Sequence, residues 1–155
     1  MIGFSAGGHL TTMVATQGDI GDANAEDPVD RMSSKLNFMV LAYPAVLGSA
    51  NLTTILLNKT SDPATADFVN SEKYLSKETP PAFIFQTADD QTVPLDRVEK
   101  FSAALKKAGV PVEMHVFPHG EHGLGLALHD SSLREWPVLL EKWLDQRGLL
   151  GVRRP

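Results

Sequence analysis

Apolar residues along the chain gather in short continuous runs, separated by segments with helical spacing. Continuous apolar runs cover residues 36–43, 82–87 and 112–117, and each borders a proline. A strand has this composition when both of its faces are covered, as in a parallel sheet. We therefore predict a buried parallel strand in each of these runs.

The segments between and after these runs have the periodicity of amphipathic helices. Apolar residues recur every three or four positions over 95–108 and again over 132–147, and a glycine follows each segment. This spacing places apolar side chains on one helix face, and glycine commonly follows a helix end. A further helix is expected over residues 6–17. Strands that alternate with helices predict an α/β domain with a mostly parallel sheet.

Two segments depart from this alternation. Residues 18–35 are polar and rich in Asp, Gly and Ala, which predicts a long surface loop. Residues 45–76 are mostly polar, with an apolar helical turn or two around 52–57. A connection of this length between core strands is usually functional or mobile.

Composition narrows the classes of function. The chain has 155 residues, a net charge of −5 and no cysteine, which excludes disulfides, thiolate metal sites and cysteine nucleophiles. It has no long basic run, so we expect no nucleic-acid partner. No run approaches the roughly 18 apolar residues of a membrane span, so we expect no membrane partner either. Localisation stays undetermined.

The first residues contain the pattern G-x-S-x-G, centred on Ser5. Residues 1–4 have the composition of a strand end, so Ser5 would lie at a sharp strand-to-helix turn. There its hydroxyl would be exposed at a helix N-terminus. Gly3 and Gly7 are expected to remove side chains that would clash where strand and helix cross. The alternative is that Ser5 only caps the helix.

Candidate acids and bases follow the later strands. Asp89 and Asp90 come after the second apolar run, and His119 and His122 come after the third. A serine hydroxyl needs a base that a carboxylate orients. The carboxyl ends of parallel strands meet at one edge of a sheet, so all these side chains are expected near Ser5. Metal binding by the two histidines would lack an obvious third ligand.

These segments together resemble the α/β-hydrolase superfamily. They are most similar to its esterase and lipase branch, which includes acetyl-xylan-esterase-like and prolyl-oligopeptidase-related enzymes. The similarity lies in GFSAGGHL (3–10), in PPAFIFQTADDQTVPLDRVEKFSAALKKAGVPVEMHVFPHGEHGLGL (80–126) and in the tryptophan-rich final helix. It extends over residues 3–144.

The resemblance selects among the candidate acids and histidines. The family pattern places its acid three residues before the valine of a Val-Pro pair. In this chain the pair is residues 93–94, so the pattern selects Asp90. The family histidine lies in a G-x-H-G loop, which selects His122 within 120–123.

The resemblance implies a serine hydrolase that cleaves carboxylic esters, either short-chain acyl or acetyl esters, including those of sugars. Ser5 would be the nucleophile, His122 its base and Asp90 the acid that orients the base. The backbone N–H of Ala6 would be an oxyanion donor. The expected partner is a small-molecule ester, with no cofactor and no metal. The alternatives are a peptidase-type serine hydrolase and an inactive fragment that needs a complementary segment or partner chain.

The resemblance also bears on domain organisation. Residues 1–148 are expected to form a partial α/β-hydrolase domain, with a cap-like or lid insertion at 45–76 and a tail at 149–155. Family members have several strands and a His-Gly-Gly loop before the serine, and only four residues precede Ser5 here. The chain is therefore expected to correspond to the C-terminal half to two-thirds of such an enzyme. An exposed sheet edge is expected to allow self-association.

Overall fold

The computed structural model describes residues 1–46 and 63–151, and its strands form one parallel sheet. Four strands pair in the order β1-β2-β3-β4: β1 (Ile2–Phe4), β2 (Met39–Ala42), β3 (Ala82–Thr87) and β4 (Val112–Phe117). The last two have the predicted bounds. The run predicted over 36–43 is strand only over Met39–Ala42, because its ladder to β3 begins where Met39 faces Ala82.

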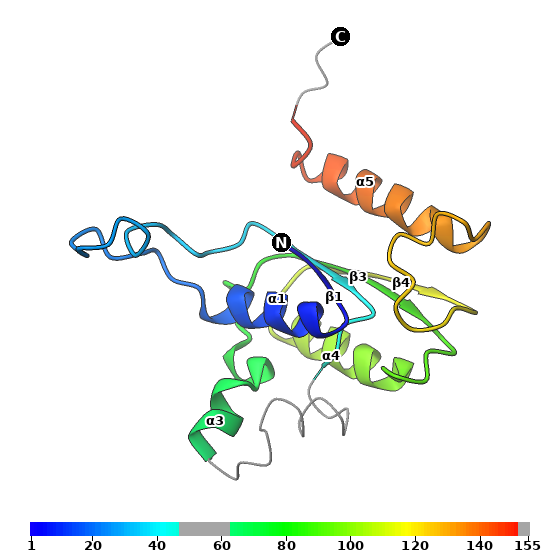
Figure 1. Ribbon diagram of the computed structural model, residues 1–155, viewed down its shortest axis with the longest axis horizontal. Coiled ribbons are helices and arrows are strands. Elements are labelled where there is room, and N and C mark those ends of the chain that lie inside the picture. Colours follow the sequence, from blue (N-terminus) through cyan, green and yellow to red (C-terminus); the bar gives the residue numbers. More distant parts are fainter. Residues whose placement is uncertain (47–62, 152–155) are drawn as a thin grey trace.

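Helices cover both faces of the sheet. The helices are α1 (Ala6–Gln17), α3 (Pro63–Phe68), α4 (Leu95–Lys107) and α5 (Trp136–Gln146), with short 3-10 turns η1 (Ser71–Tyr74) and η2 (Leu133–Glu135). In Figure 1, α1 and α4 lie on one side of the sheet and α5 lies on the other. Within residues 1–46 and 63–151, no helix is long and apolar enough to cross a membrane.

The segments predicted to be irregular have different outcomes. Residues 18–35 form turns and bends without helix or strand, as predicted. Of the insertion predicted over 45–76, the structure describes α3 and η1. The apolar turns expected around 52–57 lie outside the described residues, and a cap-like or lid role for this segment stays a prediction.

Alternating side chains of the central strands build two hydrophobic layers. On the α4 side, Met39 and Leu41 pack with Ile84 and with the buried residues of α4, Val98, Phe101 and Leu105. On the α5 side, the intervening residues pack against the α5 side chains: Val40, Ala42, Phe83, Phe85, Trp136, Leu140 and Trp143. Because both faces of β2 and β3 are covered, these strands are fully buried, as their continuous apolar composition predicts.

The strand β1 lies at an edge of the sheet. Ile2 and Phe4 on this strand are exposed by 48% and 36%, which is high for large apolar side chains. An exposed edge strand is a template for pairing with another chain. Self-association at this edge stays a prediction.

The crossing of β1 and α1 depends on Gly3. A Cβ atom at Gly3 would lie 2.1 Å from the carbonyl oxygen of Gly7 and 2.3 Å from the Thr11 hydroxyl. The expectation that Gly7 relieves a similar clash was wrong, because a Cβ atom there would meet no atom within 4 Å. The second close approach occurs one residue later, where a Cβ atom at Gly8 would lie 2.7 Å from Pro44.

We expect Gly3→Ala to lower the free energy of unfolding by about 3 kcal/mol, because the added methyl group overlaps backbone that cannot move aside. The matched control is Gly7→Ala, which has space for the methyl group and is expected to raise that free energy by about 0.5–1 kcal/mol. Urea denaturation of both variants measures the difference. Equal losses of stability in the two variants would contradict this account of the crossing.

Candidate active site

Ser5 lies at the turn between β1 and α1 in a backbone conformation that non-glycine residues rarely adopt, with φ 52° and ψ −120°. Its N–H donates to the carbonyl of Ala42 at 3.0 Å, and its carbonyl accepts from the N–H groups of Gly8 and Ala45, both at 2.9 Å. These bonds to α1 and to the end of β2 hold a conformation whose strain costs about 1–3 kcal/mol. The Ser5 side chain makes no capping hydrogen bond to α1, so it does not act as a helix cap.

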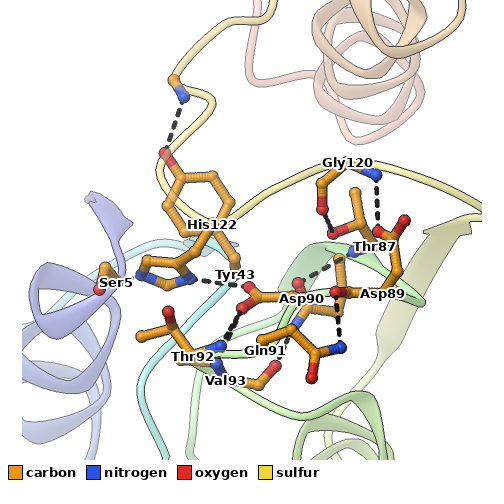
Figure 2. Close-up of polar contacts among 12 residues, drawn as sticks. Ser5, Tyr43, Thr87, Asp89, Asp90, Gln91, Thr92, Val93, Gly120 and His122 are labelled. Carbon is orange, nitrogen blue, oxygen red and sulfur yellow. Dashed lines mark hydrogen bonds and ion pairs between the residues drawn. The ribbon is translucent and has the colours of Figure 1, made fainter.

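The hydroxyl of Ser5 instead contacts a histidine from the far end of the chain. His122 Nε2 lies 2.7 Å from Ser5 Oγ, and His122 Nδ1 lies 2.7 Å from Asp90 Oδ2. Figure 2 shows the imidazole ring between the serine and the carboxylate. The structure thus brings together the three residues that the sequence predicts as nucleophile, base and acid.

The Asp90 carboxylate is buried and fixed in direction. Its residue is 3% exposed, and its Oδ1 accepts the backbone N–H groups of Thr92 and Val93, both at 2.8 Å. The loop that supplies these N–H groups is held in turn by Gln86, whose Nε2 donates to the carbonyl of Val93 at 2.8 Å. With Oδ1 occupied by backbone donors, Oδ2 is left to accept from His122 (Figure 2).

This arrangement defines the role of each imidazole nitrogen. An ionised carboxylate can only accept, so a hydrogen bond to Asp90 requires that Nδ1 of His122 carry a proton. In the neutral ring, Nε2 then has a free lone pair and accepts the Ser5 hydroxyl proton. The geometry therefore allows His122 to remove the proton from Ser5 as the hydroxyl attacks an electrophile.

Ala6 is the first residue of α1. Backbone N–H groups in a first helical turn have no partner within the helix, and the helix dipole favours negative charge there. These properties are those of an oxyanion donor, and this role of Ala6 stays a prediction.

Tyr43 is a site residue that the sequence reasoning missed. It follows β2 with a φ of 38°, and its ring packs edge-on against the imidazole of His122 with a centroid distance of 5.0 Å. Its hydroxyl oxygen accepts the N–H of Gly125 at 2.8 Å. Burial raises the pKa of Tyr43 above its ordinary value, although the Gly125 bond opposes this, and the negative charge of Asp90 adds to the rise. The hydroxyl is therefore neutral near pH 7.

The alternative acid and histidine form a separate pair. His119 Nδ1 lies 3.3 Å from Asp89 Oδ2, and the His119 side chain is 88% exposed. The structure therefore places Asp90 and His122, rather than Asp89 and His119, in the hydrogen-bond chain that leads to Ser5.

Two further histidines form polar contacts with residues other than Ser5 and Asp90. His9 Nε2 lies 2.9 Å from the carbonyl of Val69, and His115 Nε2 lies 2.7 Å from Glu113 Oε1. In the part of the chain that the structure describes, no group of three or more His, Cys, Asp or Glu side chains could hold a metal ion.

The chain is similar in sequence and in structure to known esterases and related hydrolases. A solved acetyl ester-xyloside bifunctional hydrolase from Caldicellulosiruptor lactoaceticus is 43% identical, with a TM-score of 0.88 over 97% of this chain and 57% of that one. Endo-1,4-beta-xylanase B of Butyrivibrio fibrisolvens is 31% identical over 88% of this chain, and the acetylxylan esterase of Xylanibacter ruminicola is 27% identical over 93%.

The chain spans only part of these relatives, 22% of the xylanase and 29% of the acetylxylan esterase. The likeness to solved esterases, together with the parallel sheet covered on both faces, confirms the predicted α/β-hydrolase fold. The profile of the BD-FAE family matches residues 1–105, which is more than half of the sequence. The chain therefore belongs to the BD-FAE family.

Proposed function

We propose that this chain carries the catalytic residues of a serine hydrolase that cleaves carboxylic esters. The observation that carries the proposal is the continuous hydrogen-bond chain from Ser5 through His122 to Asp90, with 2.7 Å at each link. A serine hydroxyl becomes nucleophilic when a positioned base accepts its proton, and a buried carboxylate stabilises the charged base.

The reaction proceeds through an acyl-enzyme. Ser5 Oγ attacks the ester carbonyl carbon while His122 Nε2 takes the hydroxyl proton, and the carbonyl oxygen becomes an oxyanion. When the tetrahedral intermediate collapses, the bond to the alcohol breaks and His122 gives the alkoxide its proton. Water then attacks the acyl group in the same way, with His122 as base, and releases the acid and free Ser5.

The N–H of Ala6 would point toward the developing oxyanion, since Ala6 follows Ser5 at the start of α1. The strained backbone of Ser5 supports this step because it presents the side chain at the N-terminus of the helix. An oxyanion donor is typically worth about 10²–10³ in kcat.

Acetyl esters, including those on xylan, are the substrates that we propose. The support is the names of similar proteins: an acetylxylan esterase, an endo-1,4-beta-xylanase and a solved acetyl ester-xyloside bifunctional hydrolase.

We expect a serine-reactive fluorophosphonate probe to label the wild-type chain and not the Ser5→Ala variant, because only the activated hydroxyl reacts with it. The same substitution is expected to abolish turnover of p-nitrophenyl acetate above the uncatalysed rate. In-gel fluorescence and a colorimetric assay measure the two effects. Labelling that persists in Ser5→Ala would contradict the assignment. A folded wild-type chain that neither reacts nor turns over would instead favour the inactive-fragment alternative.

The choice between the two histidines has its own test. His122→Gln is expected to lower kcat by about 10⁶, because the base in contact with Ser5 is lost. The matched control is His119→Gln, which changes an exposed side chain and is expected to leave kcat unchanged. Steady-state kinetics with p-nitrophenyl acetate compares the variants. A large loss in His119→Gln, or none in His122→Gln, would refute this assignment.

The substrate class is tested by comparing the rates at which the chain hydrolyses different ester and amide substrates. We expect acetic acid release from acetylated xylan, faster hydrolysis of p-nitrophenyl acetate than of p-nitrophenyl octanoate, and no cleavage of a proline-containing peptide. Acetate assays and chromatography measure these rates. Peptide cleavage that Ser5→Ala abolishes would instead favour the peptidase-type alternative.

A further inference from the structure

The loop that carries His122 is long and has little secondary structure of its own. Residues 118–132 connect β4 to η2 through turns and bends, without a helix or strand. Loops of this kind open easily unless other elements tie them down. A base needs its position held closely, because a misplacement of about 1 Å can cost roughly 10²-fold in rate.

Two glycines flank His122, and each has both of its backbone polar groups taken by side chains from other elements. Gly120 is held by Thr87 and Asp89. Gly125 is held by Tyr43 and Trp136. We propose that these four side chains are positioning residues, which clamp the loop on either side of His122 and so keep its Nε2 directed at Ser5. This inference rests on the proposed ester hydrolysis at Ser5.

The first clamp joins the loop to the end of β3. The hydroxyl of Thr87 donates to the carbonyl of Gly120 at 2.7 Å, and the N–H of Gly120 donates to Asp89 Oδ1 at 2.7 Å (Figure 2). Thr87 is the last residue of β3 and is 2% exposed. The same turn supplies Asp90, so this clamp fixes the loop of the base relative to the acid.

The first clamp requires a glycine at position 120, because the loop packs closely against its neighbours there. Gly120 has a φ of 152°, and a Cβ atom there would lie 2.8 Å from side-chain carbons of Thr87 and Leu124. The glycine therefore allows the loop to approach the end of β3 closely enough for both hydrogen bonds.

The second clamp joins the loop to β2 and α5. The N–H of Gly125 donates to the Tyr43 hydroxyl at 2.8 Å, and the indole N–H of Trp136 donates to the carbonyl of Gly125 at 3.2 Å. Tyr43 and Trp136 are 3% and 1% exposed, so both anchors belong to the core. The Tyr43 ring also contacts the imidazole of His122 directly, as Figure 2 shows.

Both clamps can be tested by removing one hydroxyl at a time. Thr87→Val and Tyr43→Phe each lose one hydrogen bond with little change in shape, and Thr87→Ser restores the hydroxyl. The matched controls are Thr16→Val, which loses a hydroxyl bonded within α1, and Tyr74→Phe, which changes the only other tyrosine. Activity is measured with p-nitrophenyl acetate and divided by the fraction of chains that the fluorophosphonate probe labels at its end point.

We expect Thr87→Val and Tyr43→Phe to lower the normalised kcat about three- to tenfold, as the loss of one hydrogen bond predicts, with KM within about twofold of wild type. Thr87→Ser and both controls are expected to keep the wild-type kcat. Normalised kcat values equal to those of the controls, or a change in KM alone, would overturn the proposal. So would a loss that disappears on normalisation, because it would reflect only the number of folded chains.

Amide hydrogen exchange, read by NMR, tests the clamps without activity. Exchange of the Gly120 amide in Thr87→Val and of the Gly125 amide in Tyr43→Phe is expected to be at least threefold faster than in the controls. Unchanged exchange would overturn the proposal. If the wild-type chain shows no turnover that Ser5→Ala abolishes, the proposed function is contradicted. The exchange rates alone would then decide whether the clamps exist.

Discussion

The contact between His122 Nε2 and Ser5 Oγ joins residues that are 117 positions apart, and most of the described structure serves to make it. On one side it needs a serine held in a strained turn between β1 and α1. On the other side it needs an imidazole held at the correct tautomer and direction. Neither side chain can supply these conditions by itself, so the contact depends on how the sheet arranges the ends of its strands.

The parallel sheet meets this requirement through its register. Each strand ends at the same edge, and each end contributes one part of the site: Ser5 after β1, Tyr43 after β2, Asp90 after β3 and the His122 loop after β4. The Ser5 N–H is bonded to the carbonyl of Ala42 in the neighbouring strand. Packing of α4 and α5 on the two faces of β2 and β3 therefore stabilises both the fold and the distances within the site.

Sequence patterns predicted the parts of this arrangement that depend on local composition. The runs that form β3 and β4 and the helix α1 have the predicted bounds, since continuous apolar runs and helical spacing are local signals. Ser5, Asp90 and His122 were predicted because each follows a strand within a recognisable motif. The choice of Asp90 over Asp89 depended on the resemblance, because the two carboxylates are adjacent and composition does not separate them.

The rest depended on packing that no local pattern records. Tyr43 contacts His122 only because the chain turns sharply after β2. The proline that follows Tyr43 marks the end of the strand but does not indicate which side chain the tyrosine ring meets. Gly7 was assigned to the crossing with β1, although its Cα faces open space and Gly3 makes the close approach. Thr87 and Gln86 left a weak signal, as polar residues at the end of an apolar strand, but their partners lie in other loops.

Activation of Ser5 depends on Asp90, which fixes the tautomer of His122 so that an unprotonated Nε2 faces the Ser5 hydroxyl. Nitrogen NMR of the 155-residue chain, with histidine labelled at both ring nitrogens, measures this most directly. We expect that in the neutral ring Nδ1 of His122 carries the proton and Nε2 does not, and that Asp90→Asn disturbs this state. A neutral His122 protonated at Nε2 in the wild-type chain would contradict this expectation.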